Sequence, residues 1–214
     1  MVITICMPPI PPDASSIAAE PEITRPQMNL METGGFRLPL VVCMPSTNVA
    51  ESAEVIKKLI IKSNATMLYG HIEKPEHIID HLLKIRNLQK KTGGFLTLIP
   101  LKFSLENTEL EQKNMLTQEC SSIYDLKIIA LSRLMLSGFL NNISVYWVAD
   151  GKKLAQIALS HGGNDLVGTA FSEEVYRAAG KPTNSSLLDL VNLVKEIKRE
   201  PAQRDTFFNI LRTF

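Results

Sequence analysis

Apolar residues follow two alternating patterns along most of the chain. Short continuous apolar runs, typical of strands covered on both faces, alternate with segments in which apolar residues recur every three or four positions, as on one face of a helix. The runs predict strands at residues 38–44, 65–70, 94–101, 143–149 and 166–171. The helical spacing predicts helices at residues 50–62, 75–92, 124–136, 152–160, 173–179 and 187–198, the second of them stopped by Thr92-Gly93-Gly94.

This alternation indicates an α/β fold built on parallel strands with right-handed crossovers. Two architectures share the pattern: an open doubly wound sheet and part of a (β/α)8 barrel. A complete barrel takes about 250 residues, whereas the regular pattern occupies residues 50–214. We therefore predict an α/β domain over residues 50–214 with about four βα units, the size of half a barrel.

Residues 1–49 differ from the rest because prolines interrupt them. Pro8, Pro9, Pro11 and Pro12 stand close together, and proline is poorly tolerated in both helices and sheet ladders. We predict a Pro-rich, poorly ordered segment with one short strand at residues 38–44. The prolines also stand where a signal peptide would have its apolar stretch, and no apolar run approaches the roughly 20 residues of a membrane span. The cytoplasm is the expected compartment, with no membrane partner.

Charge and cysteine content disfavour further classes. Lys and Arg number 23 and Asp and Glu 22, a formal net charge of +1, so the chain lacks the basic excess of a general nucleic-acid binder. Cys6, Cys43 and Cys120 lie too far apart for a recognisable zinc site or disulfide framework. His77 and His81 are four residues apart, but no third ligand has a recognisable spacing, and a solvated helix face is the simpler interpretation. We predict isolated thiols and no metal site.

Residues that could carry chemistry gather at three predicted strand ends. In α/β folds the functional positions lie after the carboxyl ends of strands. Glycine permits close backbone approach, proline removes an N–H donor, and amide, carboxylate and hydroxyl groups can together fix a polar ligand. Each group also has a plainer interpretation: a capped strand-to-helix turn, a strand terminator, and an Asn/Asp-stabilised turn, respectively. The groups are Gly70, His71 and Glu73; Ile99, Pro100 and Leu101 with Asn107 and Thr108; and Asn164, Asp165 and Thr169.

At these residues the sequence resembles the later half of aminodeoxyfutalosine synthase, a radical S-adenosylmethionine enzyme of the futalosine route to menaquinone. The related dehypoxanthine futalosine cyclase and the deazaflavin-forming enzymes share the Tyr-Gly-His and Asn-Asp elements. The Thr-Gly-Gly-Phe and Tyr-Trp-Val versions favour the synthase. The resemblance covers residues 53–214, and its main motifs are Asn64–Glu73, His81–Gln89, Thr92–Phe95, Tyr146–Val148 and Gly163–Thr169.

The resemblance implies two cofactors and a reaction. In that family a [4Fe-4S] cluster cleaves S-adenosylmethionine, and the adenosyl radical adds to the enol-ether double bond of 3-[(1-carboxyvinyl)oxy]benzoate. It also implies roles for the three groups. Gly70, His71 and Glu73 would lie near S-adenosylmethionine, with Ile99, Pro100 and Leu101 against its adenine. The substrate or nucleoside would contact Asn107, Thr108, Asn164, Asp165 and Thr169.

The chain departs from the family in one respect. The cluster-binding CxxxCxxC loop has no counterpart among its three cysteines, and a cluster needs thiolate ligands. One hypothesis is that this half-barrel is completed by a separate chain carrying the amino-terminal half, or by self-association. A second is a non-catalytic nucleoside or S-adenosylmethionine binder, or a remnant. A complete small enzyme of another kind would need a nucleophile, base or metal constellation that the sequence lacks.

Overall fold

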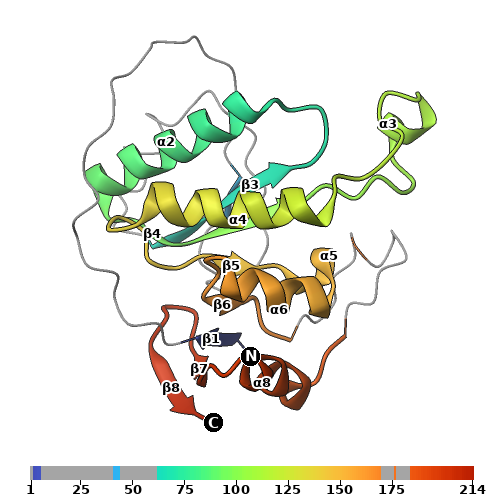
Figure 1. Ribbon diagram of the computed structural model, residues 1–214. Coiled ribbons are helices and arrows are strands. Elements are labelled where there is room, and N and C mark those ends of the chain that lie inside the picture. The colour runs from blue at the N-terminus through green and yellow to red at the C-terminus, as the bar shows by residue number, and fades with distance from the viewer. Residues whose placement is uncertain (1, 6–40, 44–61, 170–175, 177–183) are drawn as a thin grey trace, which may run out of the picture.

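The computed structural model describes residues 2–5, 41–43, 62–169, 176 and 184–214. Two sheets contain its strands (Figure 1). The three-stranded sheet has the order β2-β3-β4, and its strands are parallel. They are β2 (Val41–Cys43), β3 (Ser63–Tyr69) and β4 (Phe95–Lys102).

The five-stranded sheet has the order β5-β6-β1-β7-β8. Only its first pair is parallel, and the remaining neighbours are antiparallel. A parallel bridge between Leu98 and Ile143 links β4 to the beginning of β5, so β2 to β6 follow one another side by side in chain order. The strands are β5 (Ser144–Val145), β6 (Asp165–Leu166), β1 (Val2–Ile5), β7 (Pro201–Arg204) and β8 (Ile210–Thr213).

The helices begin and end where local sequence signals stand. In α2, Pro75 occupies the first turn, where its missing N–H costs nothing, and Gly93 ends the helix in the left-handed conformation at φ 59°. Ser186 and Asp189 cap the start of α8 reciprocally. The helices are α2 (Pro75–Thr92), α3 (Glu109–Gln112), α4 (Ser122–Leu136), α5 (Trp147–Asp150), α6 (Lys152–Ser160) and α8 (Leu187–Glu196).

Two apolar clusters form the core. In the first, α2 and α4 lie together over one face of β3 and β4 (Figure 1), and Leu82, Leu98 and Leu136 are fully buried between them. In the second, α6 and α8 pack with β5 and β6 around Leu159, Leu166 and others. The mixed α/β class and the parallel order of β2 to β6 are confirmed, and closure into part of a barrel remains a prediction.

The strand predicted at residues 143–149 is wrong over most of its length. Strand β5 has only two residues, because the chain turns at Tyr146, whose carbonyl accepts the N–H of Ala149 at 3.0 Å, and enters α5. The chain's one tryptophan, Trp147, is buried there and donates its indole N–H to the carbonyl of Gly168 at 2.7 Å. Apolar residues are therefore buried in a short helix at this point, which periodicity cannot distinguish from a strand.

Other differences between the predicted and the observed elements concern β1, β6 and the hairpin of β7 and β8. Val2–Ile5, inside the segment predicted to be poorly ordered, forms β1 between β6 and β7. The strand predicted at 166–171 is β6, which ends at Leu166, and residues 170 and 171 lie outside the described residues. The predicted helices at 50–62 and 173–179 also lie outside them, apart from residues 62 and 176. The hairpin of β7 and β8 was not predicted, because its short strands lack a continuous apolar run.

Candidate functional site

The carboxyl ends of β3 and β4 lie next to each other, with Tyr69 paired to Lys102. Immediately after Tyr69 the chain turns at Gly70, where φ is +87°. A Cβ atom at this position would lie 2.7 Å from the Sγ of Cys120, so the turn has no room for a side chain. Glycine is therefore required at position 70 both by the positive φ and by the close approach of the Cys120 side chain.

Glu73 folds back over this turn. Its carboxylate accepts the backbone N–H of Gly70 at 2.7 Å and that of His71 at 2.8 Å, and the hydroxyl of Tyr124 lies 3.4 Å from Oε1. Burial raises the pKa of Glu73, but the backbone hydrogen bonds and nearby His71 outweigh it and lower the pKa overall. Glu73 is therefore an ionised, half-buried carboxylate. The capped turn considered from the sequence is present, and a role toward a ligand remains a prediction.

A buried charged network lies behind the turn. Asp125, in the first turn of α4, accepts the ammonium of Lys102 at 2.9 Å and the thiol of Cys120 at 3.2 Å. Desolvation lowers the pKa of Lys102, but the hydrogen bond to Asp125 and the neighbouring Asp125, Cys120 and Glu119 together outweigh it and raise the pKa overall. Burial and the neighbouring Asp125 raise the pKa of the Cys120 thiol to about 12. The network thus joins β4, the loop before α4 and α4 itself directly beneath Gly70.

The sequence interpretation took Cys120 for an isolated thiol and assigned no role to Lys102 or Asp125. Lys102 ends an otherwise apolar strand, and Asp125 interrupts the apolar face of a helix. A charged residue at such a position needs a partner when it is buried. A charged residue at a position that the apolar pattern predicts to be buried is therefore the signal by which Lys102 and Asp125 could have been recognised.

Two members of the second predicted group, Ile99 and Leu101, lie on the face of β3 and β4 opposite α2 and α4, whereas Pro100 lies on the face towards these helices. Side chains alternate between the two faces of a strand, and half-buried Ile99 and Leu101 alternate with buried Leu98 and Pro100. In β3, Thr66 pairs with Ile99, and its hydroxyl is buried without a hydrogen-bond partner in the described part of the chain. This face therefore combines apolar side chains with an unsatisfied hydroxyl, which suits a nucleoside with both apolar and polar surface.

Asn107 and Thr108 form hydrogen bonds within their own loop. The backbone N–H of Asn107 donates to the carboxylate of Glu111 at 2.8 Å, and the Thr108 hydroxyl donates to the carbonyl of Leu105 at 2.7 Å. Thr108 also accepts the N–H of Glu111 at 3.3 Å, which caps the short helix α3. Their predicted role in substrate binding has no contact here that supports it, and it remains a prediction.

Asn164 and Asp165 have protein partners inside the fold. The side-chain oxygen of Asn164 accepts from Arg133 at 2.9 Å and from the N–H of Ile143 at 2.8 Å. The carboxylate of Asp165 accepts two bonds from Arg204 and one from Ser144. Asp165 begins β6, whereas Thr169 lies beyond its carboxyl end. The structure thus separates Thr169 from the other two, whose contacts stabilise the sheet; ligand binding by all three remains a prediction.

The two implied cofactors need different groups from the protein. Ile99 and Leu101 could lie against an adenine, and the ionised Glu73 carboxylate provides a negative charge for a cationic group, so this end of the sheet fits S-adenosylmethionine. The described side chains do not fit a [4Fe-4S] cluster: the one free thiol among them, Cys120, holds its proton far above neutral pH. Among the described residues no three His, Cys, Asp or Glu side chains are grouped to hold a metal ion.

His77 and His81 do not share a ligand. The ring of His77 accepts the N–H of Lys74, while His81 turns inward to within 3.3 Å of the carbonyl of Thr66. Burial lowers the pKa of His81. The solvated-face interpretation is therefore wrong for His81.

Within the described ranges, no helix has the length and apolar content to cross a membrane.

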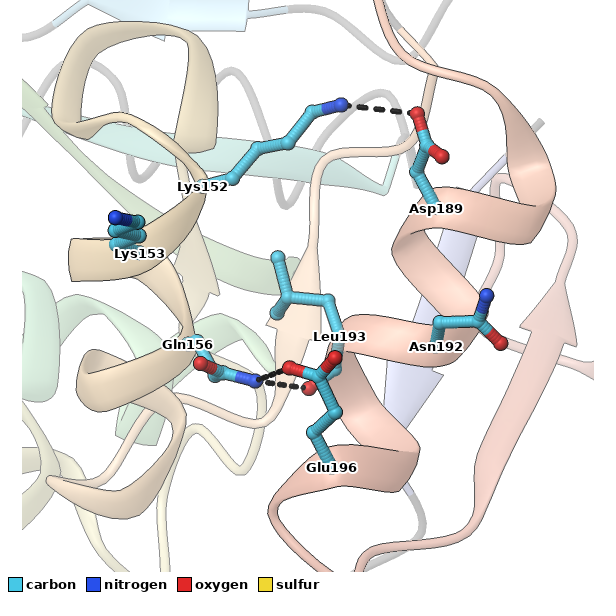
Figure 2. Close-up of a pocket in the computed structure, with 7 residues that line it drawn as sticks. All are labelled: Lys152, Lys153, Gln156, Asp189, Asn192, Leu193 and Glu196. Atoms are coloured by element: carbon cyan, nitrogen blue, oxygen red, sulfur yellow. Dashed lines mark hydrogen bonds and ion pairs between the residues drawn. The ribbon is translucent and has the colours of Figure 1, made fainter.

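A shallow surface groove separates α6 from α8 (Figure 2). Interactions between the two helices bridge it: Lys152 pairs with Asp189 at 3.0 Å, and Gln156 donates to Glu196 at 2.8 Å and to the carbonyl of Leu193 at 2.9 Å. Four of its polar side chains are therefore engaged with one another, as two pairs. The groove is therefore part of the packing interface between α6 and α8.

Comparisons with known proteins identify the family to which the chain is similar. The family model described as "CofH/MqnC C-terminal region" matches residues 92–213. The chain is 41% identical over 176 residues to the 5-amino-6-(D-ribitylamino)uracil--L-tyrosine 4-hydroxyphenyl transferase of Archaeoglobus fulgidus, a match covering 80% of this chain and 50% of that protein. The equivalent protein of Methanothermobacter thermautotrophicus is 36% identical over 173 residues, covering 78% of this chain and 47% of its own length. The chain therefore spans about half the length of these relatives.

Proposed function

This chain belongs to the CofH/MqnC C-terminal family, and from that membership we propose that it provides the carboxyl-terminal half of a radical S-adenosylmethionine transferase. The observation that carries the proposal is the juxtaposition of the Gly70–Glu73 turn with the half-buried Ile99 and Leu101 at adjoining strand ends. S-adenosylmethionine supplies the adenosyl radical in such chemistry. The protein has to hold the reacting groups in place and exclude water.

Each part of the site has a distinct task in this proposal. The ionised Glu73 attracts the cationic end of S-adenosylmethionine, while Ile99 and Leu101 cover its adenine. The rigid turn at Gly70, wedged against Cys120, fixes where the carboxylate points. The buried Lys102–Asp125 pair holds the loop before α4 beneath that turn. In this proposal the region equivalent to the amino-terminal half of the relatives provides the iron–sulfur cluster.

Two substrates are candidates. The names of the archaeal relatives describe transfer of a 4-hydroxyphenyl group from tyrosine to 5-amino-6-(D-ribitylamino)uracil, and their identity to this chain supports the same substrates. The Thr92–Phe95 and Tyr146–Val148 motifs support the alternative, addition of the adenosyl group to 3-[(1-carboxyvinyl)oxy]benzoate in menaquinone synthesis. Each of the two reactions has an aromatic substrate. This is in keeping with the apolar side chains beside the turn.

Calorimetric titration of the purified chain with S-adenosylmethionine tests the site. We expect a saturable heat, and an affinity at least tenfold weaker after Glu73→Gln or Leu101→Lys, because each removes a contact to a different part of the molecule. Glu200→Gln, at an exposed position between α8 and β7, is the matched control and should bind normally. No saturable heat, or equal binding by all variants, would contradict the proposed site.

Anaerobic assays with the amino-terminal half of the Archaeoglobus relative and each substrate set then separate the two reactions by product mass. Binding of S-adenosylmethionine without either product would favour the non-catalytic binder considered from the sequence.

A further inference from the structure

The ring of His71 is held in place at the carboxyl ends of β3 and β4. His71 follows Gly70, which comes directly after β3. Its ring lies edge-on to the ring of Phe103, with the two ring centres 5.9 Å apart. Phe103 follows β4 and donates its backbone N–H to the carbonyl of Tyr69 at 2.8 Å. The His71 ring thus lies between the two strand ends, and 26% of its side chain is exposed.

The hydrogen bonds of this ring determine which of its nitrogens carries the proton. Nδ1 accepts the backbone N–H of Ile72 at 2.6 Å and that of Glu73 at 3.2 Å. Nδ1 also lies 2.8 Å from Oε2 of Glu73, but a proton on Nδ1 would meet both backbone N–H groups. In a neutral histidine one ring nitrogen accepts while the other donates. The proton therefore belongs on Nε2, which points away from the turn because the two nitrogens face in diverging directions.

The N–H at Nε2 is a donor that a ligand can use. None of the described residues pairs with this nitrogen. The half-buried side chains of Leu101 and Phe103 provide apolar surface at the same strand ends. A fixed donor beside apolar side chains suits a flat ring that carries an acceptor oxygen.

The charge at the turn distinguishes between kinds of acceptor. The Glu73 carboxylate is ionised and lies against the same ring, so a second carboxylate at Nε2 would meet a like charge. Lys102, at the end of β4, does not offset this charge, because Asp125 and the carbonyl of Cys120 already accept its ammonium. An uncharged carbonyl oxygen meets no such repulsion.

We propose that His71 is a specificity-determining residue, whose Nε2–H donates to a neutral carbonyl oxygen on the ring of the substrate. A uracil ring carries such carbonyls, whereas 3-[(1-carboxyvinyl)oxy]benzoate offers carboxylates at neutral pH. The assignment therefore favours 5-amino-6-(D-ribitylamino)uracil, the compound in the names of the archaeal relatives. The inference rests on the proposed function, because it names the substrate class of the same site.

Nitrogen-15 NMR of the purified chain at neutral pH tests the position of the proton without any ligand. The signals of His71 are assigned by their loss in His71→Leu. We expect the shifts of a neutral ring that carries its proton on Nε2. A proton on Nδ1, in either the neutral or the charged ring, would overturn the proposal.

Calorimetric titration of the chain with 5-amino-6-(D-ribitylamino)uracil then tests the contact. We expect a saturable heat, and binding at least tenfold weaker in His71→Leu because one hydrogen bond to the ligand is lost. His71→Gln should recover part of this loss, since its amide keeps an N–H donor near the position of Nε2. His161→Leu, at an exposed position at the end of α6, is the matched control and should bind like the parent chain. Circular dichroism and urea unfolding confirm that the variants are folded.

Three results of these titrations would overturn the proposal: no saturable binding of the uracil, equal binding by the parent chain and His71→Leu, or tighter binding of the benzoate than of the uracil. Titration with S-adenosylmethionine separates the proposal from the proposed function. His71→Leu should still bind that cofactor, because the side chains of Glu73, Ile99 and Leu101 are unchanged. Loss of both ligands in His71→Leu would make His71 a structural part of the turn and would also overturn the proposal. A parent chain that binds the uracil but not S-adenosylmethionine would contradict only the proposed cofactor site.

Discussion

The carboxylate of Asp165 and the guanidinium of Arg204 form a two-bond ion pair inside the five-stranded sheet. Arg204 donates from Nε at 2.8 Å and from Nη2 at 2.7 Å. Asp165 is fully buried and Arg204 nearly so. The pair connects β6 to β7, which lie on either side of β1 in the sheet order. It thus ties the hairpin at the end of the chain to the strands that precede it.

Breaking this pair should destabilise the protein strongly. Removing one partner leaves a buried charge without compensation, a change that typically costs about 3–5 kcal/mol. We expect a loss of that size in the free energy of unfolding for Arg204→Met, measured by urea denaturation. Lys152→Met removes an exposed pair with Asp189 and should change the same quantity by about 0–1 kcal/mol. Similar losses in both variants would refute a structural role for the buried pair.

Gly70→Ala should destabilise the turn for two separable reasons. The new Cβ would lie 2.7 Å from the Sγ of Cys120, and an alanine at positive φ loses about 1 kcal/mol or more relative to glycine. Combining Gly70→Ala with Cys120→Ala removes the clash with sulfur but not the backbone strain. In a double-mutant cycle, we expect Gly70→Ala to cost less in the Cys120→Ala background. Strict additivity of the two changes would show that the sulfur is not in contact with the turn.

Alkaline pH should reduce stability through Cys120. The folded chain keeps the thiol proton to a pKa of about 12, whereas the ordinary value is 9.0. Between these values the folded state binds more protons than the unfolded state, so the free energy of unfolding falls as pH rises from 9 towards 12. Cys120→Ser keeps a hydroxyl donor for Asp125 but does not titrate there, and its stability should fall less steeply. Lys102 and Tyr69 are present in both proteins, so their titration does not account for a difference between them. Parallel curves of unfolding free energy against pH would contradict the prediction.

Thr66→Val should separate stability from binding. The Thr66 hydroxyl is buried without a described partner, and replacing it by a methyl group removes a desolvation cost of about 1–3 kcal/mol. We expect unchanged or higher stability in urea, together with weaker binding of S-adenosylmethionine or substrate if the hydroxyl faces the ligand. Ser132→Ala removes another buried hydroxyl without a described partner, on α4, and should leave binding unchanged. Weakened binding in both variants would argue against a specific role for Thr66.

Sequence reasoning succeeded where the determining interactions are local. The start of α2 at Pro75 and its end at Gly93 depend on residues within one or two turns. The capped turn from Gly70 to Glu73 is equally local, since its hydrogen bonds span two or three residues. Such features can be recognised from spacing and residue type alone.

The parts that sequence reasoning missed depend on contacts between distant residues. Asp165 was a ligand candidate because its partner Arg204, 39 residues away, is not recognisable from spacing. Lys102 and Asp125 are 23 residues apart and meet only because β4 and α4 pack together. Strand β5 is short because Trp147 turns to a carbonyl 21 residues later in the chain. Tertiary contacts of this kind override local patterns of hydrophobicity.

The position of Trp147 makes the protein its own spectroscopic reporter. As the only tryptophan of the chain, its indole accounts for the tryptophan emission, and its burial against β6 predicts fluorescence at short wavelength that moves to the red when water reaches the ring. The signal comes from the junction of α5 and β6, within the second apolar cluster. Emission can therefore follow opening of that cluster separately from events at the Gly70 turn, without any added dye.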